Sequence, residues 1–273
     1  MSSTLTFFTP RSGSTYINDL LSIQNGNLNL DEFLHSKLRG NFFNRLPRQV
    51  ANIIAPINDK TLTRTTRESW LAASKLYNEK VDIVKLINKQ YGVSLKEVSQ
   101  HAIRNLDGLF NYCIDNNFKI IFVYRENIYD QVYSFLCSRI RHEMAKTRNI
   151  PDDTCYLNFK NSPQVFGQVR VKFDMDHALI NLSNIVKMSE TWLAHYSKYK
   201  KHATLVSYEQ IVVNKQYKAL DISDNIVDNY QKLNDSVIPF DIGTTGSMIA
   251  NWDDIRPYID YYNSMYINLK DEV

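Results

Sequence analysis

The sequence is poor in the residues that hold small secreted or metal-bound folds together. It has three cysteines, Cys113, Cys137 and Cys155, and no Cys-x-x-Cys pair. An odd number of cysteines without that spacing argues against a disulfide framework and against a zinc site. The six histidines are scattered along the chain and form no metal-ligand motif. We therefore expect a protein that needs neither a disulfide nor a metal.

Long apolar runs, a secretory signal and an excess of charge of one sign are also missing. No stretch approaches the ~18 consecutive apolar residues of a membrane span, and residues 1–9 lack the basic and apolar regions of a signal peptide. The formal net charge is only +3, because 32 Lys and Arg are nearly balanced by 29 Asp and Glu. This balance argues against a nucleic-acid partner. We expect a soluble, cytoplasmic protein, and no pattern indicates its oligomeric state.

Glycine and proline are few, with eight and seven in 273 residues. Low-complexity linkers and collagen-like repeats are thereby excluded, and compact connections are expected. The chain is 44% hydrophobic and 22% charged, which is ordinary globular usage. Its length favours one large domain over residues 1–273.

Short apolar runs alternate with amphipathic helical patterns. Strands are predicted at residues 5–8, 120–124 and 203–207. Helices are predicted at residues 16–21, 69–77, 79–91, 94–116, 128–144, 174–199 and 252–265. The helix at 94–116 is placed by the capping-box spacing of Ser94 and Glu97. Residues 24–70 look loop-rich with a short helix at 31–38, and residues 148–172 and 214–250 look irregular.

Strands separated by helices indicate an α/β fold with a central parallel sheet flanked by helices. In such sheets ligands bind outside the carboxyl ends of the strands. The residues that follow each strand are therefore the candidates for a site.

The first strand is followed by Arg11-Ser12-Gly13-Ser14-Thr15 and then by a helix. Such a loop offers backbone N–H groups, the positive end of a helix dipole, hydroxyl donors and a guanidinium to a phosphate. An ordinary serine cap on the first helix is the alternative. A nucleoside-triphosphate P-loop is a poor match, because no lysine precedes Ser14 or Thr15.

The strand at 120–124 is followed by Arg125, and Ser134 comes nine residues later. Ser134 then lies about two turns into the next helix, from where both side chains can reach one anion. Alternatively, Arg125 pairs with a carboxylate and Ser134 faces solvent. Two anion sites at the ends of adjacent strands suggest a ligand with a phosphate at each end.

These motifs resemble those of sulfotransferases that use 3′-phosphoadenylyl sulfate (PAPS). The run from Thr9 to Ile17 is similar to their 5′-phosphosulfate loop, and residues 121–134 are similar to their 3′-phosphate strand and helix. Val206-Ser207-Tyr208-Glu209 resembles a third motif, the strand end near the adenine. The Arg-to-Ser spacing is more like that of bacterial carbohydrate enzymes, including the trehalose type, than that of the cytosolic phenol and steroid enzymes. The motifs cover residues 5–210 in the family's order.

The resemblance implies a single-domain, P-loop-like sulfotransferase fold with PAPS as co-substrate and adenosine 3′,5′-bisphosphate (PAP) as product. It implies that Ser12, Gly13, Ser14 and Thr15 hold the 5′-phosphate and that Arg11 stabilises the leaving oxygen. Arg125 and Ser134 would hold the 3′-phosphate, and Tyr208 would lie near the adenine. The acceptor would be the hydroxyl of a small molecule or glycan, with carbohydrate or glycolipid favoured. No metal is implied.

A carboxylate is the implied catalytic base. In the trehalose-type enzymes a Glu followed by aromatics stands shortly after the first helix, and Glu32 occupies that place here. His35 is the second candidate, because an imidazole titrates near neutral pH, and Asp31 is a minor one. Glu32 in a surface turn without a catalytic role is the alternative.

The resemblance is incomplete in a late loop. Residues 243–247 stand where many of these enzymes use basic residues for the 3′-phosphate, but they include no Lys or Arg. Phe42, Phe43, Arg139 and Arg141 are candidates for the acceptor cleft or for plain packing. A P-loop-like small-molecule kinase and a non-catalytic nucleotide-binding relative remain as alternatives.

Overall fold

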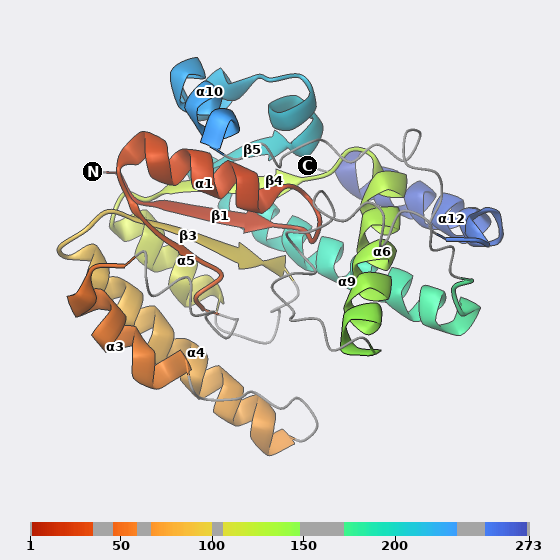
Figure 1. Ribbon diagram of the computed structural model, residues 1–273, viewed down its shortest axis with the longest axis horizontal. Coiled ribbons are helices and arrows are strands. Elements are labelled where there is room, and N and C mark those ends of the chain that lie inside the picture. The colour runs from red at the N-terminus through yellow and green to blue at the C-terminus, as the bar shows by residue number, and fades with distance from the viewer. Residues whose placement is uncertain are drawn as a thin grey trace.

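Among the residues that this computed structural model describes, five strands pair in parallel, in the order β2-β3-β1-β4-β5 (Figure 1). The structure describes residues 2–34, 46–58, 67–99, 106–147, 172–233 and 249–271. The strands are β1 (Thr4–Phe8), β2 (Leu28–Asp31), β3 (Val93–Val98), β4 (Lys119–Tyr124) and β5 (Ala203–Ser207). The predicted α/β fold with a central parallel sheet is confirmed.

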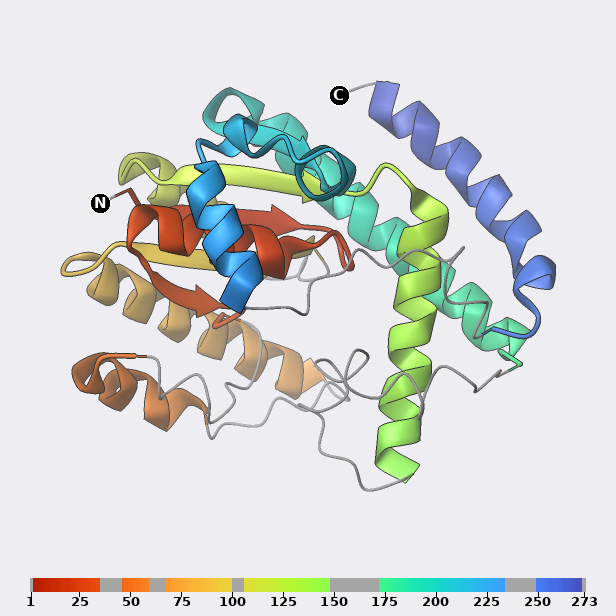
Figure 2. The same ribbon diagram turned by 45° about the horizontal axis from the view of Figure 1, so that its top comes forward.

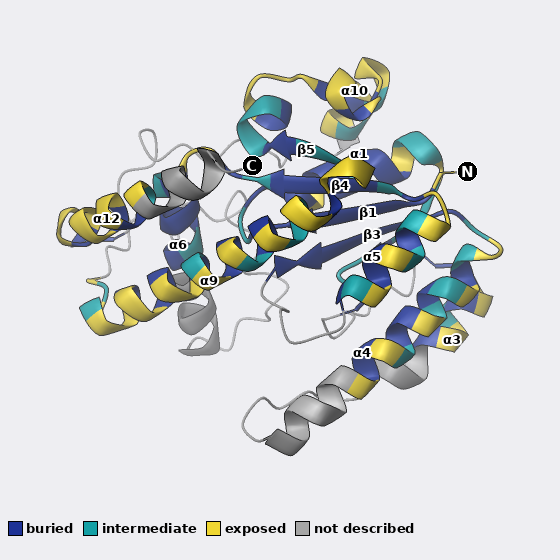
Figure 3. Ribbon diagram, turned by 180° about the vertical axis from the view of Figure 1, so that it is seen from behind, coloured by how far each residue is buried: buried dark blue, intermediate teal, exposed yellow. Residues whose placement is uncertain are grey.

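Helices connect the strands and cover both faces of the sheet. They are α1 (Ser14–Asn25), α3 (Arg48–Asn58), α4 (Arg67–Asn88), α5 (Leu106–Asp115), α6 (Ile128–Thr147), α9 (Met175–Tyr199), α10 (Asp224–Leu233) and α12 (Trp252–Asp271). Short helical segments are η2 (Lys200–His202), the π-helix η3 (Glu209–Val213) and η4 (Tyr217–Leu220). Helices α1 and α10 lie on one face, with α10 crossing α1 in Figure 2. Helices α5 and α9 lie on the opposite face (Figure 3).

Alternation along the strands sends side chains into two separate cores. On β1, Leu5 and Phe7 join the cluster beneath α5 and α9, whereas Phe8 joins the cluster beneath α1. On β4, Ile120 and Phe122 face the first cluster, and Ile121 and Val123 face the second. A strand buried on both faces reads as a continuous apolar run, which is why β4 was evident from the sequence.

The helix predicted at 94–116 is wrong at its start. Residues 93–98 form β3, and the helix begins only at Leu106. Ser94 is not a cap: its hydroxyl accepts a hydrogen bond from Thr4 Oγ1 of the neighbouring strand at 2.9 Å. Glu97 is buried within the strand rather than at a helix end. Pairing with β1 therefore outweighed the local capping signal.

The prediction from the sequence also missed β2, which lies in the segment 24–70 that was expected to be loop-rich. It pairs with β3 at the edge of the sheet. The short helix expected at 31–38 does not begin at Asp31, because this residue ends β2. The helices predicted at 69–77 and 79–91 are one helix, α4.

The remaining strands and the helices α1, α6, α9 and α12 lie where the sequence predicts them, with α12 extending to Asp271. The segment 214–250, expected to be irregular, contains η4 and α10. No helix in the described ranges has both the length and the apolar character required to cross a membrane.

Candidate functional site

The carboxyl ends of β1 and β4 lie side by side and bring the two predicted anion loops together. Phe8 pairs with Val123, and the amide of Thr9 continues the ladder by donating to Val123 O at 3.2 Å. The arrowheads of both strands point toward α6 in Figure 1. Residues from the β1–α1 loop and from the β4–α6 junction therefore share one edge of the sheet.

The loop after β1 reverses sharply before α1 begins at Ser14. Arg11 has a φ of 64° and Gly13 a φ of 73°, both in the left-handed region. Gly13 occupies the N-cap position, so the first turn of α1 receives no side-chain cap from it. Ser12 is fully buried, and its hydroxyl has no hydrogen-bond partner among the residues that the structure describes. Unpaired donors at the start of a 12-residue helix suit an anion.

Two features require a glycine at position 13: the left-handed backbone conformation and the close approach of the Tyr208 ring. A Cβ added at Gly13 would overlap the Tyr208 ring. The Arg125 guanidinium lies over the same ring, 4.2 Å from its centroid. Burial raises the pKa of the Tyr208 hydroxyl, so this ring stays neutral at physiological pH. Tyr208 thus bridges the two junctions.

Arg11 links the two junctions directly. Its Nε donates to Ser134 Oγ at 3.0 Å, and Nη1 of Arg125 donates to the carbonyl of Arg11 at 3.2 Å. Ser134 is buried and bonded, so it does not face solvent. Four of the residues predicted from the sequence, Arg11, Gly13, Arg125 and Ser134, are therefore neighbours.

Arg125 pairs with carboxylates in this structure. Its Nε lies 3.3 Å from Glu209 Oε1, and its Nη2 lies 3.6 Å from Asp130 Oδ2. The Glu209 carboxylate also accepts hydrogen bonds from the backbone amides of Glu126 and Asn127. The alternative that Arg125 pairs with a carboxylate is therefore observed, with Glu209 at the start of η3 as the main partner.

Gln131 ties the first loop to α6. Its Nε2 donates to Thr9 Oγ1 at 3.1 Å and to Pro10 O at 2.7 Å. Gln131 was not among the predicted site residues, although a polar glutamine directly before the apolar Val132 of α6 could have drawn attention to it.

Lys96 is the most consequential residue that sequence reasoning missed. It lies on β3, and its side chain is almost fully buried. Its Nζ lies 2.6 Å from Thr15 Oγ1, 2.8 Å from Asp31 Oδ1 and 3.2 Å from Glu32 Oε1. The alternation of Val93 and Leu95 could have indicated a strand, but the capping-box spacing of Ser94 and Glu97 led to the prediction of a helix there.

The charge state of Lys96 follows from these contacts. Burial alone would lower the pKa of its ammonium, but the Glu32 and Asp31 carboxylates outweigh burial and raise that pKa above its ordinary value. Lys96 is therefore a permanent cation beside the first turn of α1. The loop, which has no lysine of its own, receives one from a neighbouring strand.

The structure describes two of the three candidate bases and only some of the other predicted site residues. Glu32 and Asp31 lie at the end of β2, where both face Lys96. His35 lies outside the described residues, as do Phe42, Phe43 and the loop 243–247, and the side chains of Arg139 and Arg141 are not described. Ser14 is buried and Thr15 is exposed apart from its contact with Lys96.

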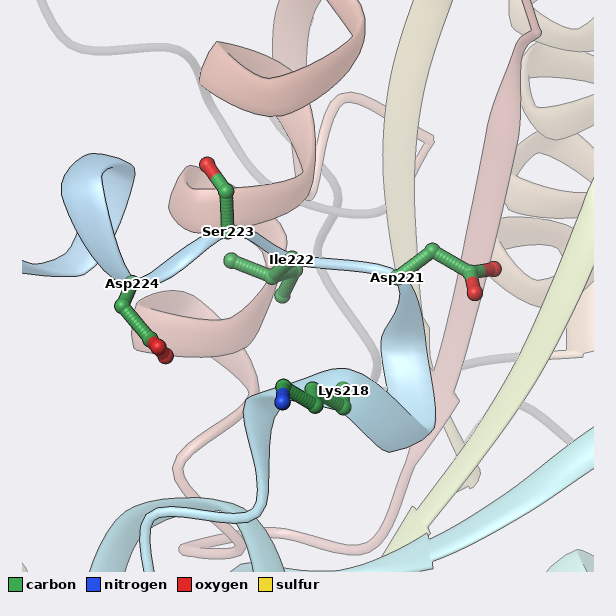
Figure 4. A pocket seen from close by; sticks show the side chains of 5 residues that line it. All are labelled: Lys218, Asp221, Ile222, Ser223 and Asp224. Atoms are coloured by element: carbon green, nitrogen blue, oxygen red, sulfur yellow. The ribbon is translucent and has the colours of Figure 1, made fainter.

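A surface cavity of about 370 Å³ lies elsewhere, lined by Lys218, Asp221, Ile222, Ser223 and Asp224 (Figure 4). Lys119, the first residue of β4, donates to Asp221 Oδ2 at 2.6 Å. The cavity therefore borders the amino ends of the strands, at the opposite edge from the candidate site. Among the side chains that the structure describes, no group of three or more His, Cys, Asp or Glu could hold a metal ion.

Comparisons of the chain with protein families, with curated proteins and with solved structures gave no match.

Proposed function

We propose that this chain transfers a sulfuryl group from PAPS to an acceptor hydroxyl, with a carbohydrate or glycolipid as the favoured acceptor. The observation that supports this most is the hydrogen bond from Arg11 to Ser134. It joins the loop expected to bind the 5′-phosphosulfate to the helix expected to bind the 3′-phosphate. A donor with phosphates at both ends needs both groups of residues at one edge of the sheet.

The loop and the first turn of α1 bind the 5′ end of the donor in this proposal. The amides and hydroxyls of Ser12, Gly13, Ser14 and Thr15 surround the phosphate. Lys96 adds positive charge beside Thr15, and the buried hydroxyl of Ser12 gains a partner that it lacks among the described residues. Charged donors held in a buried setting stabilise charge strongly, because little reorganisation is needed when it develops.

The acceptor oxygen attacks sulfur in line with the departing oxygen. A new S–O bond forms to the acceptor, and the S–O bond to the 5′-phosphate breaks, which leaves PAP. Arg11 neutralises the charge that develops on the leaving oxygen, and Glu32 accepts the acceptor's proton. Glu32 is 27% exposed, so it is open to solvent and to an acceptor while it is still held by Lys96.

Binding of the 3′-phosphate requires an exchange at Arg125. In this structure Glu209 and Asp130 neutralise the guanidinium. In the proposal a phosphate replaces Glu209 as the main partner of Arg125 and also contacts Ser134. Tyr208, which neighbours Glu209 and packs on Arg125, then adjusts around the adenine.

The test is a thermal-shift and calorimetry panel with PAP, ATP, AMP and NAD, followed by turnover of PAPS with trehalose and glucose as acceptors. Stabilisation by PAP at about 100 times its Kd amounts to roughly 2.7 kcal/mol. Binding of PAP in clear preference to AMP supports the proposal. No binding of PAP at millimolar concentration contradicts it.

A small-molecule kinase is the second candidate, and one observation favours it. Lys96 supplies the lysine that the first loop lacks, and Asp31 and Glu32 are carboxylates beside it. Nucleotide kinases need both a phosphate-binding lysine and a carboxylate for Mg²⁺. Stabilisation by ATP with Mg²⁺ that exceeds stabilisation by PAP would select this function.

A further inference from the structure

The acidic pair Asp31 and Glu32 lies on a strained end of β2. The pairing of β2 with β3 shifts register between Asn29 and Asp31. Asp31 has a φ of 47°, in the left-handed region that non-glycine residues seldom adopt. Such a conformation persists only where the surroundings hold it in place. The residues that hold this bend therefore control where the two carboxylates point.

The side chain of Asn29 holds the bend. Its Oδ1 accepts a hydrogen bond from the backbone amide of Asp31 at 2.9 Å and another from Asn18 Nδ2 at 2.9 Å. Its Nδ2 donates to Asp19 Oδ1 at 2.6 Å. The reverse orientation of this amide would place its NH₂ against two donors and its oxygen against a carboxylate. The network therefore permits only one orientation of Asn29.

Asp19 anchors Asn29 from α1. Its second oxygen accepts a hydrogen bond from the Tyr230 hydroxyl of α10 at 2.8 Å. Burial raises the pKa of Asp19, and the bonds from Tyr230 and Asn29 oppose that shift. The charges of Asp31 and Lys96 also act on it, in opposite directions. Asp19 thus connects α10, α1 and β2 in one polar network behind the acidic pair.

We propose that Asn29 and Asp19 are positioning residues: they fix the left-handed bend at Asp31, which turns Asp31 and Glu32 onto Lys96 beside Thr15. The catalytic meaning of this arrangement rests on the proposed function, because Glu32 is the base there. The positions of the two carboxylates and of Lys96 are observed in the structure and do not depend on the proposed function. Without the bend, β2 would continue as an extended strand, and successive side chains would point to opposite faces.

The first test measures the burial of Lys96 rather than activity. The intact protein is treated with acetic anhydride, and acetylation of each lysine is quantified by peptide mass spectrometry. In Asn29→Ala and in Asp19→Ala we expect acetylation of Lys96 to rise about tenfold, because its two carboxylates no longer hold it. Lys80, which is also buried but lies on α4, should stay protected.

Asn27→Ala is the matched control. Asn27 is another asparagine, directly before the same strand, and it bonds to Ser2 O and Ser94 Oγ rather than to the network. Unchanged acetylation of Lys96 in both test variants overturns the proposal. So does an equal rise at Lys80, because it would indicate general loosening.

The second measurement separates this proposal from the proposed function. For an enzyme that uses PAPS, Asn29→Ala should lower kcat by up to about 100-fold while the KM for PAPS stays within about twofold. Equal changes in kcat and KM would argue against a positioning role. If the wild-type protein does not bind PAP, the proposed function is wrong. The acetylation of Lys96 would still decide whether Asn29 and Asp19 fix the bend at Asp31.

Discussion

Nε of Arg125 lies 3.3 Å from Glu209 Oε1, so a carboxylate of the chain occupies the partner position that the proposed 3′-phosphate would take. Both side chains are largely buried, with exposures of 7% and 17%. The same carboxylate accepts hydrogen bonds from the backbone amides of Glu126 and Asn127, directly before α6. Any anion that binds Arg125 must compete with Glu209.

Glu209→Gln should therefore tighten PAP binding. The amide keeps an oxygen acceptor for the backbone of Glu126 but removes the competing negative charge, and we expect the Kd to fall about three- to tenfold. Isothermal titration calorimetry measures it, with Glu126→Gln, an exposed glutamate next to Arg125, as control. A weaker complex in Glu209→Gln would mean that Glu209 supports the site instead of competing for it.

Arg11→Ala should lower PAPS turnover by about 100- to 1,000-fold, because loss of one donor to a developing oxyanion has that effect. It should also break the bond to Ser134. Arg48→Ala, a change of an exposed arginine on α3, is the control. Initial rates of PAP release measure the effect. Near-normal turnover of Arg11→Ala would show that Arg11 does not stabilise the leaving oxygen.

Glu32→Gln should abolish turnover but leave the Kd for PAP nearly unchanged, because a base contacts the acceptor and not the nucleotide. Glu190→Gln, at an exposed position of α9, serves as control. If Glu32→Gln transfers sulfate normally, His35 becomes the favoured base, and His35→Ala should then be inactive.

Gly13→Ala should destabilise the fold more than Gly26→Ala. Both glycines have positive φ, of 73° and 63°, so an alanine at either position costs about 1–2 kcal/mol of backbone strain. A Cβ at Gly26 meets open space, whereas one at Gly13 overlaps the Tyr208 ring. We expect Gly13→Ala to cost a further 1–3 kcal/mol or so. Urea unfolding measures both, and equal losses would show that Tyr208 moves away freely.

His195 should make the fold less stable in mild acid. Burial lowers the pKa of His195 in the folded protein, against the opposing charge of Asp107 on α5 and with the added effect of Lys198. The unfolded chain binds the proton more readily. This contribution to stability is therefore complete above the unfolded pKa of about 6.5 and is lost as the pH falls toward the lower folded pKa.

The measurement is urea unfolding of the wild type and of His195→Phe at pH 7.5 and pH 5.5. The imidazole stacks on Phe110 at a centroid distance of 5.4 Å, so a phenyl ring suits the position. We expect the loss of stability at pH 5.5 to shrink in His195→Phe and to persist in His177→Gln, whose histidine is exposed. The same pH dependence in all three proteins would contradict this account.

The sequence predicted the parts of the site that depend on local order along the chain. Arg11, Gly13, Arg125 and Ser134 each follow a strand whose apolar run was evident, and parallel pairing brings such positions to one edge. Lys96 could not be placed in the same way, and Glu209, although it follows the predicted strand β5, was not expected to pair with Arg125. Their roles depend on pairing between β3 and β1 and on the path of η3, neither of which leaves a local pattern in the sequence.

The position of β1 in the middle of the sheet has a consequence for synthesis on the ribosome. Thr4 pairs with Ser94 on one side and with Lys119 on the other, so the first strand is made long before its neighbours. At a synthesis rate of roughly 5–20 residues per second, both edges of β1 stay unpaired for on the order of 5–25 seconds, until β3 and β4 have been made. A nascent chain that stops before β4 exposes the apolar residues of β1 and lacks the half of the candidate site that follows β4.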